Sequence, residues 1–244
     1  MLLRVGIFYG LTFIFTILLA LFQQILGIGF EKITFPQLGP GVAALAMLIF
    51  FKRDKIKINL SVKDVGVLKY TIALLLPLIV AGAVFLIYSQ FIGEINIRID
   101  SPPAFLMILG GMFIGAFGEE IGWRGYLQKL LEQKQNALVS GILIGLLWGL
   151  WHLGNYQYGL FYLVFFLFST IGSSVVLVWL LRKTNFNVLL AALFHMSLNI
   201  GYYAFFRDVL SDPRLMVLNG LAWIIISIAV VLTGRESFGN KESV

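Results

Sequence analysis

The sequence predicts an all-α protein that crosses the membrane about eight times, as a single integral membrane domain over residues 1–244. Two observations support this fold class. The chain is 59% hydrophobic and only 12% charged, with a mean hydropathy of +0.93, whereas a soluble domain has about 25% charged residues. The apolar residues also gather into eight runs, and most of these approach the roughly 20 residues that a membrane-spanning helix needs.

The expected spans follow from these runs and their flanks. They are residues 4–28, 36–51, 66–92, 104–120, 137–158, 159–181, 187–206 and 215–233. The first run is too long for a signal-peptide core and is interpreted as a retained helix. The second and fourth are short, which indicates partial spans or continuation into polar flanks. The sequence Ser101-Pro102-Pro103 predicts the start of the fourth, with proline in the first turn.

The distribution of basic residues predicts the orientation. If the N-terminus is cytoplasmic, most Lys and Arg residues fall in cytoplasmic segments, as the positive-inside rule requires. The exceptions are Lys32, Arg98, Arg207 and Arg214. We therefore expect a multi-pass protein of the cell membrane with both termini in the cytoplasm. Basic residues are not interleaved with aromatic ones as in proteins that follow a phosphate backbone, so no nucleic-acid partner is expected.

The segment between the fourth and fifth expected spans, residues 125–136, has three leucines on one helical face, continued by Leu138, and polar residues on the other. This pattern is typical of an amphipathic helix that lies at the cytoplasmic interface. An ordinary connecting helix fits the pattern equally well.

Two adjacent acids, Glu119 and Glu120, end the apolar run of the fourth span. Carboxylates at the edge of the hydrocarbon layer mark a functional site by default, although acids that merely ring the interface are the alternative. Consecutive helical residues point in different directions. Arg124 follows Glu120 by four residues, the favourable order for a helical ion pair. The spacing thus assigns Glu120 to Arg124 and leaves Glu119 to face a cavity, where desolvation makes a carboxylate a stronger base.

Both histidines of the chain, His152 and His195, also lie in apolar spans. His195 and Asn199 share a helical face, and two adjacent donors of this kind can stabilise an oxyanion. The alternative for either histidine is a plain hydrogen bond to a neighbouring helix. The presence of both histidines in apolar spans, together with the two glutamates, favours a functional site over plain hydrogen bonds between helices.

Glycines at four-residue spacing precede Glu119 and His152, on the fourth and fifth spans. Small residues let helices approach closely, so these two stripes predict that the two helices pack together. Their depths disagree, however. At 1.5 Å per residue His152 lies roughly 22 Å into its span, whereas Glu119 lies near the cytoplasmic end of its own. Either the fifth span starts later, residues 125–136 dip inward, or the fourth helix is re-entrant.

Three motifs in order resemble those of the CAAX-protease and bacteriocin-processing (CPBP, or Abi) family of intramembrane proteases, which includes the type II CAAX prenyl endopeptidases. The sequence from Glu119 to Arg124 fits the family's EExxxR motif. Trp148 to His152 fits an aromatic residue followed by xxxH, where Phe is usual. The segment 195–199 fits HxxxN. The resemblance covers about residues 104–206, the expected catalytic core.

The resemblance implies an intramembrane endopeptidase that acts on a membrane-associated or prenylated (CAAX-type) protein or peptide, in a cavity open to the membrane or the cytoplasm. Bacterial relatives process leader peptides, pheromones or bacteriocins, and the sequence does not choose among these. Glu119 would activate water with His152, and His195 with Asn199 would stabilise the oxyanion.

The resemblance further implies that Glu120 and Arg124 order the site. The family is also described as metalloproteases, and two His with a Glu can form a catalytic zinc site. Because no HExxH pattern is present, we favour a glutamate mechanism without cofactor and keep zinc as the alternative. A non-proteolytic scaffold or bacteriocin self-immunity protein is the main functional alternative. A transporter or proton relay is another, although the chain lacks the internal repeats of many transporters.

Overall fold

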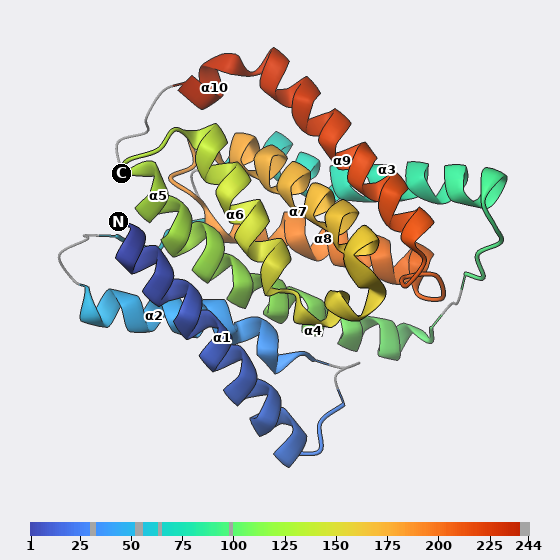
Figure 1. Cartoon of the computed structure of the whole chain (residues 1–244), viewed down its shortest axis with the longest axis horizontal. Coiled ribbons are helices and arrows are strands. Elements are labelled where there is room, and N and C mark those ends of the chain that lie inside the picture. Colours follow the sequence, from blue (N-terminus) through green and yellow to red (C-terminus); the bar gives the residue numbers. More distant parts are fainter. Residues whose placement is uncertain (30–32, 52–55, 63–64, 98–99, 240–244) are drawn as a thin grey trace.

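The computed structural model describes residues 1–29, 33–51, 56–62, 65–97 and 100–239, and it is a bundle of helices (Figure 1). The α-helices are α1 (Leu2–Ile25), α2 (Gly39–Phe50), α3 (Val67–Phe91), α4 (Pro102–Glu120), α5 (Lys129–Glu132), α6 (Ala137–Trp151), α7 (Gly159–Leu181), α8 (Val188–Phe206), α9 (Pro213–Thr233) and α10 (Arg235–Gly239). Three further segments are the 3₁₀ helices η1 (Phe35–Leu38) and η4 (Leu153–Tyr158) and the π-helix η3 (Ile121–Gln128). Over the described ranges there is no strand, only an isolated bridge between Asn59 and Asn187.

Apolar helices occur at all eight expected positions, which confirms the all-α polytopic membrane fold. Among the described residues, six are long and apolar enough to cross a membrane: Leu2–Ile25, Val67–Phe91, Pro102–Glu132, Leu153–Leu181, Val188–Phe206 and Pro213–Thr233. Two are shorter, Phe35–Phe50 and Ala137–Trp151. The short second span was expected. The fifth span is shorter than predicted, because His152 leaves the helical conformation (φ −75°, ψ 69°) and the chain continues as η4.

The fourth span begins at Pro102, as predicted, but does not end at residue 120. It continues through η3 and α5 to Glu132. The prediction of an interfacial amphipathic helix is wrong, because Gln128, Lys129 and Glu132 on its polar face are buried. Buried polar groups need partners. Arg182 of the α7–α8 connection supplies one, with its Nη1 2.9 Å from Glu132 Oε2.

This continuation removes the disagreement in depth. Glu119 lies 13 residues before Glu132, which corresponds to roughly 20 Å of helix at 1.5 Å per residue. That is close to the expected depth of His152 within the fifth span. Of the three sequence-based alternatives, the inward course of residues 125–136 is therefore the one that the structure shows.

The two glycine stripes do not pack against each other, which corrects the sequence-based prediction. On the fourth span a Cβ at Gly115 would lie 2.8 Å from Cδ of Gln37, so this stripe faces η1. On α6 a Cβ at Gly145 would lie 2.5 Å from the Cα of Ile171, so this stripe faces α7. Each stripe allows a close approach, as small residues do in membranes, but with a different neighbour.

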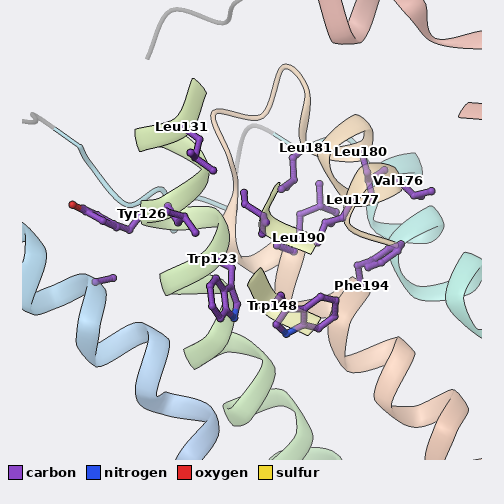
Figure 2. Packing of buried hydrophobic residues seen from close by; sticks show 14 of the residues in the cluster. Trp123, Tyr126, Leu131, Trp148, Val176, Leu177, Leu180, Leu181, Leu190 and Phe194 are labelled. Atoms are coloured by element: carbon purple, nitrogen blue, oxygen red, sulfur yellow. The ribbon is translucent and has the colours of Figure 1, made fainter. Parts of the chain in front are cut away.

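A cluster of large side chains fills the centre of the bundle (Figure 2). Trp123 of η3, Trp148 of α6 and Phe194 of α8 are labelled there, and all three are buried. Phe8 of α1 packs edge-on to Trp123, with ring centroids 5.7 Å apart. The motif-bearing parts of the chain thus meet within one apolar core.

The bundle has two distinct ends (Figure 1). The start of α1 and α10 lie at one end, and the α3–α4 and α8–α9 connections lie at the other. In the predicted topology the first end is cytoplasmic. Of the basic residues used in that prediction, several lie outside the described residues: Lys32, Lys52, Arg53, Lys55, Lys63, Arg98 and Lys241.

Candidate active site

Glu120 occupies the centre of a buried charged cluster. Its Oε1 lies 3.1 Å from Nη1 of Arg124, which confirms the ion pair predicted from the i, i+4 spacing. The same oxygen lies 2.9 Å from Nδ1 of His195, on α8. Arg124 also donates to Ser174 of α7 at 3.3 Å. These contacts join the fourth span to α8 through the Glu120 carboxylate and to α7 through the Arg124 guanidinium.

Glu119 has different partners. Its Oε1 accepts a hydrogen bond of 3.0 Å from Nε2 of Gln37, and its Oε2 accepts one of 2.8 Å from the indole Nε1 of Trp148. The side chain is fully buried. Both donors are neutral, so no cation contacts this carboxylate directly within the part of the chain that the structure describes. The two neighbouring glutamates therefore lie in electrostatically different surroundings.

Sequence reasoning missed Gln37 altogether and gave Trp148 only a packing role. Gln37 lies in η1, where Pro36 fixes the first helical turn. Its signal in the sequence is faint, since it is the one polar side chain in the apolar run 36–51. The signal for Trp148 was the departure from Phe at this motif position, because indole has an N–H donor that Phe lacks.

His152 ends α6, and its ring nitrogen Nδ1 lies 2.8 Å from the backbone oxygen of Trp148. A carbonyl oxygen can only accept, so Nδ1 carries the proton of this hydrogen bond. In the neutral ring Nε2 is then left as an acceptor. The Trp148 ring lies between the two imidazoles, with its centroid 5.6 Å from that of His152 and 5.0 Å from that of His195.

His195 and Asn199 lie one helical turn apart on α8, as their spacing predicts. The bond from Nδ1 of His195 to Glu120 leaves Nε2 as the ring nitrogen available to other groups. Asn199 is half-buried, and among the described residues its amide has no hydrogen-bond partner. Two side chains capable of donating a hydrogen bond are thus held on neighbouring turns.

A cavity of about 420 Å³ joins these groups. Its wall includes His152, His195 and Asn199, together with Gln37 and Trp148. Within the described ranges Glu119 is not part of the wall. It lies directly behind the cavity, bonded to two of the side chains that form the wall. The structure thus places both imidazoles and the amide on one cavity and places Glu119 one side chain away from it.

The cavity wall also reaches exposed residues at one end of the bundle. The wall residues at this end come from the α6–α7 and α8–α9 connections and the end of α8, and include Asn155, Tyr158, Tyr203, Arg207 and Leu210. These connections lie at the end of the bundle opposite the start of α1. In the predicted topology this is the extracytoplasmic end, so these wall residues do not support an opening to the cytoplasm, and the expected opening to the membrane stays a prediction.

The residues that the structure describes contain no group of three or more His, Cys, Asp or Glu side chains with the placement of metal ligands. Each histidine contacts a protein partner through Nδ1, and Glu119 accepts from Gln37 and Trp148, which leaves Nε2 of each ring and further lone pairs of the carboxylate for other groups. Zinc stays the alternative, and no step is derived through a metal.

Comparison with known proteins agrees with the motifs. Residues 101–201 match the model of the Rce1-like family, described as type II CAAX prenyl endopeptidase Rce1-like. Among curated proteins, Lysostaphin resistance protein A of Staphylococcus epidermidis is 26% identical over 236 residues, and the protein of the same name from Staphylococcus aureus is 27% identical over 238. Both alignments cover 93% of this chain, which spans 61% and 54% of the lengths of these two relatives.

The matched region contains the EExxxR, aromatic-xxxH and HxxxN motifs, so the resemblance expected from these motifs is confirmed. Residues 101–201 of this chain are thus similar to the Rce1-like family of type II CAAX prenyl endopeptidases.

Proposed function

We propose that this protein is an intramembrane endopeptidase that hydrolyses peptide bonds of a membrane-associated protein or peptide. One observation carries the proposal. A buried carboxylate held only by neutral donors, that of Glu119, lies directly behind a cavity lined by His152, His195 and Asn199. Similarity of the motif-bearing region to the Rce1-like family supports the same reaction class.

Glu119 and His152 are the groups proposed to activate water. A carboxylate has about four lone-pair sites, and two of those on Glu119 accept from Gln37 and Trp148. The remaining sites can accept from a water molecule that enters from the cavity. Nε2 of His152 can accept the other hydrogen of that water, because Nδ1 holds the proton. General-base catalysis of this kind contributes typically 10²–10⁴-fold, on the order of 3–5 kcal/mol.

His195 and Asn199 are the proposed stabilisers of the tetrahedral oxyanion. When protonated, His195 donates from Nδ1 to Glu120 and from Nε2 toward the cavity. Asn199 adds an amide N–H on the next turn of α8. Donors fixed in a water-poor site stabilise developing charge more than they would in water. Glu120 and Arg124 do not reach the cavity wall. Their proposed role is to orient His195.

The test is Glu119→Gln, with Glu94→Gln on the exposed α3–α4 connection as the matched control. The termini of membrane peptides and proteins should be compared in cells that carry each variant. We expect uncut precursor to accumulate with Glu119→Gln and not with Glu94→Gln. Normal cleavage by a stably folded Glu119→Gln protein would exclude the glutamate mechanism. Metal analysis of the purified protein, with activity before and after chelator, tests the zinc alternative separately.

A second candidate function is resistance without proteolysis, because the curated relatives are named for lysostaphin resistance. A scaffold or self-immunity protein would not need a reactive carboxylate. If this chain confers resistance and the Glu119→Gln variant confers it equally, the scaffold function is supported. If resistance is lost together with cleavage, both depend on the proposed active site.

A further inference from the structure

The cavity wall includes exposed residues of connections at one end of the bundle, and the side of the membrane that this end faces is the side from which the cavity can be reached. Along the chain α6 leads to η4, α8 leads to residues 207–212, and η1 precedes α2. All three connections contribute to the cavity wall. In a bundle whose spans alternate in direction these connections lie at the same end, and Figure 1 shows the α8–α9 connection far from the start of α1.

The depth of the site agrees with this assignment. Asn199 lies seven residues before the end of α8 at Phe206, which is roughly 10 Å of helix. His152 directly follows the last residue of α6 and directly precedes η4. On the opposite side, α6 and the α5 continuation separate the histidines from the end that carries α1 and α10. Access from that other end would have to cross the packed core around Trp123 and Leu130.

Charge and aromatic residues distinguish the two ends. Basic residues of the described chain concentrate at the end of α1 and α10, as in Lys57, Lys134 and Lys183. Tyrosines gather around the cavity mouth, among them Tyr158 and Tyr203. Lys and Arg favour the cytoplasmic side and Tyr favours the membrane–water interface. Together these distributions place the cavity mouth at the extracytoplasmic interface.

We propose that the substrate enters from the extracytoplasmic side. It is an extended segment of an exported peptide or of the outer part of a membrane-anchored protein, rather than a lipidated C-terminus in the cytoplasm. This inference names the substrate class of the proposed protease and rests on that function. The inner wall of the cavity contains Tyr162, Phe166 and Tyr202, which suits an apolar or aromatic side chain of the substrate.

The chain has no cysteine, so single cysteines can report the side from which each position is reached. Asn155→Cys lies in the cavity wall, Gln157→Cys lies at the exposed rim on η4, and Lys134→Cys lies at the opposite end. Intact cells are treated with a membrane-impermeant maleimide, and the labelling is compared with that of permeabilised cells. The unmodified protein is the blank.

We expect Asn155→Cys and Gln157→Cys to react in intact cells as fully as in permeabilised cells, and Lys134→Cys to react only after permeabilisation. The reverse pattern would overturn the proposal, because the mouth would then face the cytoplasm. Reaction of Gln157→Cys without reaction of Asn155→Cys in either preparation would also overturn it, since the cavity would then be closed to water.

Mapping of cleaved bonds separates this inference from the proposed function. Bonds cut by wild type and spared by Glu119→Gln should lie in extracytoplasmic segments. Cuts confined to cytoplasmic segments would refute the substrate class and leave the protease intact. Absence of any cut would refute the protease, while the labelling result would still decide which side the cavity faces.

Discussion

Replacement of Glu120 by glutamine removes the negative charge from a cluster that the protein buries completely. Nη1 of Arg124 lies 3.1 Å from this carboxylate and Nδ1 of His195 lies 2.9 Å from it, and Glu120 and Arg124 are both fully buried. Loss of one partner of a buried ion pair lowers stability by about 3–5 kcal/mol, because the other charge is left uncompensated. This is a large part of the roughly 5–15 kcal/mol that stabilises a typical protein.

Replacement of Glu119 by glutamine should have a much smaller effect on stability. Its two partners, Gln37 and Trp148, are neutral donors. A glutamine keeps one acceptor oxygen and loses about one hydrogen bond, a change of about 1–3 kcal/mol. Removal of a buried charge offsets part of that loss. We expect Glu119→Gln to remain folded and Glu120→Gln to unfold readily.

Unfolding of the purified protein in detergent micelles, followed by circular dichroism, measures the difference. Arg124→Gln and the Glu120→Gln/Arg124→Gln double variant complete a mutant cycle, and residues in direct contact show interaction energies of about 0.5–3 kcal/mol in such cycles. Equal destabilisation by the two glutamate variants, or strict additivity in the cycle, would refute the reasoning from the buried cluster.

Three further changes test other parts of the structure. Trp148→Phe removes the indole donor to Glu119 and should lower stability by about 1–3 kcal/mol, measured by thermal unfolding; an unchanged midpoint would refute the importance of this bond. Gly145→Val should destabilise by about 1–3 kcal/mol, because its Cβ would meet the Ile171 backbone. Gly10→Ala, whose Cβ meets no atom within 4 Å, should not destabilise, and equal effects would contradict the assigned helix contact. Hydrogen bonds from Arg214 hold the pKa of Asp212, before α9, at about 2, below its ordinary 3.8. The contribution of Asp212 to stability is therefore present above about pH 4 and is lost as the pH falls through 2. In the Asp212→Asn variant the midpoint of unfolding should therefore change less between pH 5 and pH 2 than it does in the wild type.

The helices were predictable from the sequence because hydropathy alone determines where a chain can cross a membrane. The end of the fourth helix was not predictable in this way. Its apolar run ends near Phe117, but the helix continues to Glu132 because its polar residues find partners inside the protein. Arg182, which pairs with Glu132, is 50 residues away in the chain. A partner so distant leaves no local signal, so a buried polar helix has the same pattern as an interfacial one.

The site was predictable to the extent that its geometry is local. The i, i+4 pair of Glu120 and Arg124 and the shared face of His195 and Asn199 follow from helical periodicity. Contacts between helices could not be predicted from helical periodicity. The glycine stripes indicated close packing but not the partner, and Gln37 reaches Glu119 across 82 residues of sequence. The catalytic roles of these residues stay predictions until the variants are measured.

The adjacency of the two glutamates now has a physical interpretation. Because consecutive helical residues point in different directions, Glu120 faces α8 and Glu119 faces α6 and η1. Oε1 of Glu120 contacts Arg124 and His195, which hold this carboxylate away from the cavity wall. Glu119 accepts from Gln37 and Trp148, which are themselves part of the wall. If the protein hydrolyses peptide bonds, the proton of the attacking water should therefore pass to Glu119 or His152, while Glu120 keeps His195 in position.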